Sequence, residues 1–114
     1  MRPGLLQPAA MDQLDRLEAI IRERRTGDPA SSYVAKLTAR GRAKIAQKLG
    51  EEATETVIAA VQDDKAALTG EAADLLFHLL VLLADAGLSL DDVRAELARR
   101  EGVSGIDEKA SRSA

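Results

Sequence analysis

Cysteine and tryptophan are absent from this chain of 114 residues, and its only aromatic residues are Tyr33 and Phe77. The lack of cysteine excludes disulfides and thiolate metal sites, and it fits a reducing compartment such as the cytoplasm. The scarcity of aromatic residues leaves a core of Leu, Ala, Val and Ile, which favours helices because few residues suit strands. We therefore expect one all-α domain over residues 1–114.

A strong charge of one sign is also missing. The net charge is −3 with acids and bases interspersed, so the chain shows no electrostatic footprint for nucleic acid. The longest apolar run, residues 75–84, contains His78 and is too short to span a bilayer. The first residues lead to no uninterrupted apolar run, so we expect no signal peptide. The sequence thus predicts a cytoplasmic protein without nucleic-acid or membrane partners.

Apolar spacing and capping residues predict a bundle of four to five helices. Residues 1–10 form a loose arm, and the first helix begins behind Asp12 as N-cap. It ends at residues 26–29, where Gly27 adopts the left-handed conformation. The remaining helices are expected at Ser32 to about Arg40, Gly41 to Gln62, Lys65 to Ala86 (with Gly87 as its cap) and Ser89 or Asp91 to Arg100, followed by a tail over 102–114 that is a loop or a short helical turn.

The two long predicted helices differ in polarity. The first is expected to bury a face made by Leu49, Ala53, Val57, Ala60 and Val61. The second is apolar almost all round in its later half, apart from a polar stripe of Glu71, Asp74, His78 and Asp85. A helix with that pattern is buried on most sides, and a monomer this small offers too little cover. We therefore expect a homodimer or a dimer of dimers.

Acidic residues form one group on each long helix. Glu51, Glu52 and Glu55 fall within an arc of roughly 100°, because an α-helix turns about 100° per residue. Glu71 and Asp74 are three residues apart and share a face of the next helix. A turn signal over residues 62–65 joins the two helices as an antiparallel hairpin. All five acids are therefore expected to meet at one level.

Five carboxylates at one level repel one another unless a cation or bound protons offset the repulsion. Oxygen ligands without cysteine favour a hard cation, Mg²⁺ or Mn²⁺ in its place. Lys44 and Lys48 lie on the stripe of the first acid group, and a metal flanked by lysines suits a polyphosphate. The alternative is a solvated helix face whose glutamates pair with Lys48. Glu71 and Asp74 favour the metal site, because charges on an otherwise apolar helix need a reason.

Three further polar residues allow two interpretations each. His78 is either a packed histidine bonded to Asp74 or to a carbonyl, or a group that contacts substrate or supports a metal ligand. Tyr33 is either a packing residue or a contact for a nucleotide. Asp85 is either a cap or a solvated group near a helix end. We keep His78 and Tyr33 as candidate substrate-binding residues.

Glu-Glu-x-x-Glu at residues 51–55, followed by Glu-x-x-Asp at 71–74, resembles the signature of the all-α, MazG-like nucleoside triphosphate pyrophosphohydrolases. Within that superfamily the chain is most similar to the phosphoribosyl-ATP pyrophosphatase family of histidine biosynthesis. Three pieces carry this resemblance: residues 32–53, residues 71–80, and the ending Ser-Gly-Ile-Asp-Glu-Lys-Ala-Ser-Arg at 104–112. The ending distinguishes the histidine-pathway family from the rest of the superfamily.

The resemblance implies Mg²⁺-dependent hydrolysis of phosphoribosyl-ATP, with water attacking between the α and β phosphates. The products are phosphoribosyl-AMP and pyrophosphate. The catalytic acids carried over are Glu51, Glu52, Glu55, Glu71 and Asp74; the last four are metal ligands, while Glu51 either binds metal or orients the water. Lys44 and Lys48 hold phosphates, and Ser104, Gly105, Lys109 and Arg112 either close over the phosphoribosyl end or form a purely structural tail.

Other functions remain open at this stage. A housecleaning dCTP or dUTP pyrophosphatase of the same superfamily is the nearest alternative. A non-catalytic helical interaction module is an alternative of another class. A di-iron carboxylate bundle is disfavoured, because it needs Glu-x-x-His at i and i+3 on two helices. Here the only histidine follows Asp74 by four residues.

Overall fold

The computed structural model of this chain describes residues 11–103 and 105–113. In this part the predicted all-α fold is confirmed. The expected arm over residues 1–10, Ser104 and Ala114 lie outside the described residues. The described part forms six helices rather than four to five: α1 (Gln13–Arg24), α2 (Tyr33–Arg40), α3 (Arg42–Val61), α4 (Lys65–Asp85), α5 (Leu90–Arg100) and α6 (Gly105–Ser113).

Capping residues begin α1 and α5 as the sequence predicts. The Asp12 carboxylate accepts from the N–H of Asp15 at 2.9 Å, and the Asp15 carboxylate accepts from the N–H of Asp12 at 3.3 Å. Ser89 and Asp92 form the same reciprocal capping box at the start of α5, and Ser32 caps α2. Each cap satisfies an N–H that the helix itself leaves unpaired, and is typically worth about 1 kcal/mol.

The prediction of a left-handed Gly27 is wrong. Positive φ occurs at Gly41 (97°), between α2 and α3, and at Gly87 (77°), which ends α4 as predicted. The backbone of Gly27 is instead close to a neighbour, because a Cβ there would lie 3.2 Å from the carbonyl oxygen of Arg24, a tight contact that a small shift would have to relieve. The N–H of Gly27 donates to that carbonyl at 2.9 Å. The chain then turns at Asp28, whose carboxylate accepts a backbone N–H two residues on, at 2.9 Å.

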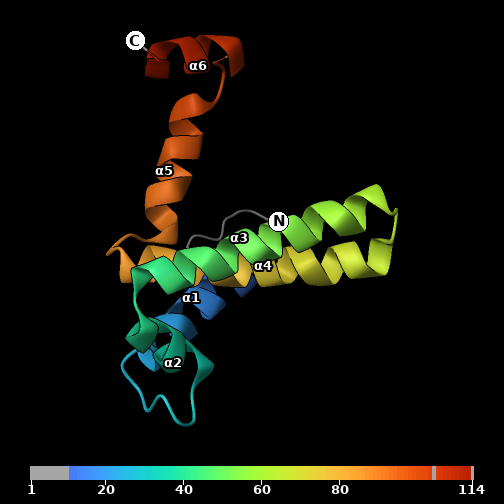
Figure 1. The fold of residues 1–114 in the computed structure, drawn as a ribbon. Coiled ribbons are helices and arrows are strands. Elements are labelled where there is room, and N and C mark those ends of the chain that lie inside the picture. The colour runs from blue at the N-terminus through green and yellow to red at the C-terminus, as the bar shows by residue number, and fades with distance from the viewer. Residues whose placement is uncertain (1–10, 104, 114) are drawn as a thin grey trace.

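Helices α3 and α4 form the predicted antiparallel hairpin and lie side by side along their length (Figure 1). The turn at residues 62–64 uses Asp63 in the left-handed region (φ 54°), which aspartate tolerates better than most residues. Asp64 then caps α4 by accepting from the N–H of Ala67 at 3.0 Å. This hairpin holds both acid groups, so its register decides which acids meet.

The hydrophobic core lies at one end of the hairpin, where α1 and α2 pack against α3 and α4 (Figure 1). Asp85 reinforces this end, which contradicts its interpretation as a solvated group. Its carboxylate is 15% exposed and pairs with Arg25 at 3.3 Å and Arg42 at 2.9 Å. The buried core residues are Ile21, Val34, Leu37, Ile45, Leu80 and Val81.

The predicted apolar face of α3 is wrong in its second half. Val57 is 60% exposed and Val61 is 81% exposed, whereas Ile45, Glu52 and Ala59 are buried. These three buried residues recur every seven positions and form one stripe of α3. The stripe faces α4 at an acid, since Glu52 meets Glu71 of α4. The spacing of apolar residues therefore predicted the wrong buried face of α3, because one of the buried positions is a glutamate.

Helix α4 is the one helix in the described part that is long and apolar enough to cross a membrane, although its run 75–84 alone is too short. Length and composition alone do not distinguish a membrane-spanning helix from the core helix of a soluble protein. Only 17% of its apolar stretch is buried in the single chain. Its outer face therefore remains available to another molecule.

The end of the chain projects from the bundle. Helix α5 stands away from the hairpin, and α6 lies across its far end (Figure 1). None of the residues of α5, all of which the structure describes, is buried. The expected loop or short turn at the tail is instead the nine-residue helix α6.

Candidate metal and phosphate site

Three of the five predicted acids come together in the hairpin. Glu52 and Glu55 lie on α3 three residues apart, so they point from the same side of the helix. Glu71 approaches them from α4. One carboxylate oxygen from each of these residues lies within 4.8 Å of the other two. We call Glu52, Glu55 and Glu71 the acid triad.

The triad is an electrostatically costly arrangement. Glu52 is only 8% exposed. The buried Oε1 of Glu71 has no hydrogen-bond partner within the described part of the chain. Burial, followed by repulsion from Glu55 and Glu52, raises the pKa of Glu71 above its ordinary value. A buried acceptor without a partner beside two further carboxylates fits a bound cation better than a solvated helix face.

Glu51 is exposed and points about 100° away from Glu52 around α3. Its carboxylate accepts from the Gln47 amide at 2.9 Å and pairs with the Lys48 ammonium at 3.2 Å. These contacts, the Gln47 bond first, lower the pKa of Glu51. Consecutive residues of a helix differ by about 100° in direction, so Glu51 and Glu52 cannot both face α4. Asp74 is exposed, and its carboxylate is not part of the triad among the described residues.

The two predicted phosphate-binding lysines lie beside the acids. The hydrogen bond to Glu51 is the main cause of the raised pKa of Lys48, with smaller contributions from Tyr33 and Glu52. Lys44 lies close enough to Glu51 to contribute to the lowered pKa of that carboxyl. The site therefore places fixed cations next to a set of cation-binding oxygens.

A cluster of rings borders this region. The Nδ1 of His78 lies 2.8 Å from the carbonyl oxygen of Asp74, so Nδ1 carries a proton and donates it. In the neutral ring Nε2 is then an acceptor, and the hydroxyl of Tyr33 donates to it at 3.0 Å. The interpretation of His78 as a packed histidine bonded to a carbonyl is confirmed. The bond to Tyr33 was not predicted, since 45 residues separate the two and no local pattern signals it.

The tail residues lie apart from the triad in a single chain. Gly105, Lys109 and Arg112 belong to α6, which Figure 1 shows at the far end of α5, away from the hairpin. Ser104 lies outside the described residues. The structure of one chain therefore does not bring the predicted tail contacts to the acids.

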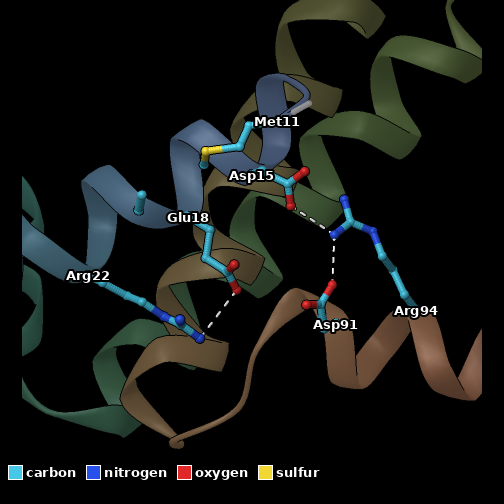
Figure 2. Close-up of a pocket in the computed structure, with 7 residues that line it drawn as sticks. Met11, Asp15, Glu18, Arg22, Asp91 and Arg94 are labelled. Carbon is cyan, nitrogen blue, oxygen red and sulfur yellow. Dashed lines mark hydrogen bonds and ion pairs between the residues drawn. The ribbon is translucent and has the colours of Figure 1, made fainter. Parts of the chain in front are cut away.

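Two open depressions in the described surface, each of about 580 Å³, also lie away from the acid triad. Figure 2 shows the one between α1 and α5, where Arg94 contacts Asp15 at 2.8 Å and Asp91 at 2.9 Å. In the same view Arg22 pairs with Glu18 at 3.5 Å. Each charged side chain in this depression pairs with one of opposite sign, so it is a seam of ion pairs between helices. The triad remains the better candidate site although it lies outside both hollows.

Comparison with known proteins bears on the reaction. A family model described as "Phosphoribosyl-ATP pyrophosphohydrolase" matches residues 14–101. A protein named "Phosphoribosyl-ATP pyrophosphatase" from Novosphingobium aromaticivorans is 68% identical over 100 residues, covering 88% of this chain and 94% of that protein. Proteins of the same name from Rhizorhabdus wittichii and Sphingopyxis alaskensis are 66% and 57% identical, covering 87% and 95% of this chain and 93% and 100% of their own lengths.

Proposed function

This chain belongs to the phosphoribosyl-ATP pyrophosphohydrolase family, and we propose that the acid triad and its neighbouring lysines carry out that family's reaction. The chain is an enzyme that hydrolyses phosphoribosyl-ATP to phosphoribosyl-AMP and pyrophosphate, the second step of histidine biosynthesis. The observation that supports the location is the buried, unpartnered Oε1 of Glu71 between the carboxylates of Glu52 and Glu55 within the described part of the chain.

The triad fits a hard divalent cation. Its donors are all carboxylate oxygens, which Mg²⁺ prefers, and Mn²⁺ can substitute for it. Glu52, Glu55 and Glu71 would hold the ion, and Asp74, three residues after Glu71, would add a ligand from the same helix. When bound, Mg²⁺ supplies charge stabilisation to phosphate oxygens. The triad alone cannot supply this positive charge, because all three of its side chains are anionic when ionised.

The neighbouring residues take the remaining roles. Lys44 and Lys48 bind phosphate oxygens and neutralise charge that develops on the leaving pyrophosphate. Glu51 orients the attacking water between the α and β phosphates. Its carboxyl is ionised at neutral pH, so it can accept a proton from that water, and the contacts with Gln47 and Lys48 that lower its pKa also weaken it as a base. When substrate binds, Lys48 exchanges its pairing with Glu51 for phosphate, and this frees the Glu51 carboxylate.

The enzyme acts as a homodimer or a dimer of dimers in the cytoplasm. Support for assembly comes from the uncovered apolar side chains of the hairpin, among them Leu76, which is 43% exposed, and Val57, which is 60% exposed. The tail residues Ser104, Gly105, Lys109 and Arg112 contact the phosphoribosyl end of the substrate. Because α6 stands away from the triad of its own chain, assembly or movement of α5 must bring the two together.

A substrate panel tests the proposed reaction. Pyrophosphate release is measured with phosphoribosyl-ATP, ATP, dCTP and dUTP, each with and without Mg²⁺. We expect phosphoribosyl-ATP to give the highest kcat/KM, and only when the metal is present. Preference for dCTP or dUTP would identify a housecleaning pyrophosphatase instead. Absence of release from any of the four would support a non-catalytic interaction module.

A further inference from the structure

The few rings in this chain lie together. Tyr33 and Phe77, the only two aromatic residues, have ring centroids 6.1 Å apart at an interplanar angle of 26°. The imidazole of His78 stands edge-on to both, at 5.9 Å from Tyr33 and 5.1 Å from Phe77. His78 is buried and Phe77 half-buried, whereas Tyr33 is 49% exposed. The cluster thus presents one open ring to solvent.

The open ring is held in place before any ligand arrives. Tyr33 is the first residue of α2, so its backbone is fixed by the helix start and by the Ser32 cap. Its hydroxyl is bonded to His78, whose other ring nitrogen is bonded to the Asp74 carbonyl. Phe77 backs the ring on one side. A ligand that stacks on such a ring loses little conformational entropy, because the side chain is already ordered.

The position of the ring relates it to the phosphate-binding groups. His78 follows Glu71 by seven residues on α4, which corresponds to about 10 Å along the helix. On the α3 side, Lys48 is close enough to both Tyr33 and Glu52 for the two to contribute to its raised pKa. Lys48 therefore lies near both the open ring and Glu52 of the acid triad.

We propose that the exposed face of Tyr33 is the subsite on which the purine base of the substrate stacks, with Lys48 holding the phosphates that lead to the acid triad. This inference rests on the proposed function and assigns the base-binding residue of the same site. An aromatic side chain can stack on any nucleobase, because every base has a π-face. A base that carries an additional phosphoribosyl group still offers that face.

The chain offers a direct test, because Tyr33 is its only tyrosine and tryptophan is absent. Intrinsic fluorescence of the full-length protein therefore reports on Tyr33 alone. AMP is titrated as the probe, with ribose 5-phosphate as a matched ligand without a base, and absorbance losses are corrected with free N-acetyltyrosinamide. Saturable quenching by AMP and none by ribose 5-phosphate is the expected result. Equal responses to the two ligands, or no saturable response to AMP, would overturn the proposal.

Two variants give a kinetic test of the same subsite. Tyr33→Leu should raise KM for phosphoribosyl-ATP by roughly ten- to a hundredfold, with a smaller change in kcat. Tyr33→Phe keeps the ring but loses the bond to His78, and it should recover most of the lost affinity. If Tyr33→Phe is as impaired as Tyr33→Leu, the hydrogen bond and not stacking is what matters, and the proposal is wrong.

The same measurements separate the subsite from the reaction. If the unaltered enzyme turns over phosphoribosyl-ATP and Tyr33→Leu leaves KM unchanged, the base subsite is not at Tyr33, whereas the proposed function is retained. If the unaltered enzyme releases no pyrophosphate from that substrate, the function fails, and the AMP titration still decides whether Tyr33 binds a base. If Tyr33→Leu does not fold, the AMP titration of the unaltered protein decides the same question without the variant.

Discussion

Glu71 occupies an electrostatically unfavourable position in the site. Its Oε1 is buried without a hydrogen-bond partner in the described part of the chain, and two glutamates face it from α3. Burial and these neighbours raise the pKa of its carboxyl. The folded metal-free protein therefore binds a proton at Glu71 more readily than the unfolded chain does. The contribution of Glu71 to the free energy of unfolding is then greatest below the ordinary carboxyl pKa, and it falls as pH rises through the raised pKa.

Replacement of Glu71 by Gln tests this pH dependence. The Gln side chain does not titrate, so in metal-free buffer Glu71→Gln should gain melting temperature over the unaltered protein as pH rises above about 4.5. Thermal melts of both proteins between about pH 4 and 8, with chelator, measure the difference. Millimolar Mg²⁺ should raise Tm of the unaltered protein more than that of the variant, because bound cation relieves the repulsion. A Tm difference independent of pH would contradict the assigned cause.

At the residue scale, sequence reasoning grouped five carboxylates, three of which come together, but it did not separate their directions. Glu51 and Glu52 are adjacent in one motif, yet one bonds to Lys48 and the other is buried against α4. A helical wheel groups all three acids of α3 within one arc, and only the packing of α4 shows which side of that arc is inside. The roles of Glu51 and Asp74 remain predictions.

At the scale of elements, polar contacts set the direction of α5. The Glu18 carboxylate on α1 accepts from the N–H of Leu90 at 2.6 Å. Arg94 on α5 joins Asp15 of the α1 capping box at 2.8 Å (Figure 2). It also pairs with Asp12 at 3.5 Å. The bond to Asp15 is the largest cause of the raised pKa of Arg94, which stays charged. Because α5 has no fully buried residue and packs its first residue, Leu90, only partly against the core, this polar seam supplements a small apolar contact.

Arg94→Ala should therefore loosen α5 without unfolding the bundle. Hydrogen exchange at the amides of α5 should quicken several-fold, and high salt should quicken exchange in the unaltered protein in the same direction. Arg16→Ala is a matched control, because the hydrogen bonds of Arg16 go to Met11 and Gln13 beside it in sequence. Equal exchange in the two variants would mean that α5 is held by something other than the ion-pair seam.

Element positions were largely predictable because their ends carry local signals. Asp12 and Ser89 cap helices where expected, since a capping side chain and the N–H from which it accepts are only three residues apart. Gly27 was misassigned because its role depends on how close a Cβ would come to a carbonyl, which sequence does not reveal. The helix α6 was also not foreseen, because its residues are mostly polar and show no apolar periodicity.

At the scale of the whole molecule, the single chain is open. The hairpin of α3 and α4 extends beyond the core formed with α1 and α2, and α5 projects on another side (Figure 1). The scarcity of aromatic residues predicted the all-α class correctly. The apolar character of α4 predicted a second subunit, and the exposure of Leu76 and Val57 agrees with that expectation without testing it.

Leu76→Asp tests the assembly. Leu76 is 43% exposed on α4, and a charge there would be costly inside an apolar subunit interface. Light scattering at micromolar concentration should show an oligomer for the unaltered protein and a monomer for the variant. Leu88→Asp is the control, since Leu88 is 46% exposed but lies in the loop after α4. A stable monomer in the unaltered protein would contradict the proposed dimer.

The central claim is that the triad of Glu52, Glu55 and Glu71 performs the family's chemistry with a bound cation. The most direct measurement is pyrophosphate release from phosphoribosyl-ATP by Glu52→Gln in saturating Mg²⁺, with Glu23→Gln on the exposed surface of α1 as the control. Glu52→Gln keeps the shape of the side chain and removes one charge, so kcat should fall by about a hundredfold or more. Its metal-free Tm should hold or rise, because one repulsive charge is gone. Near-normal release by Glu52→Gln would show that the triad is not the catalytic site.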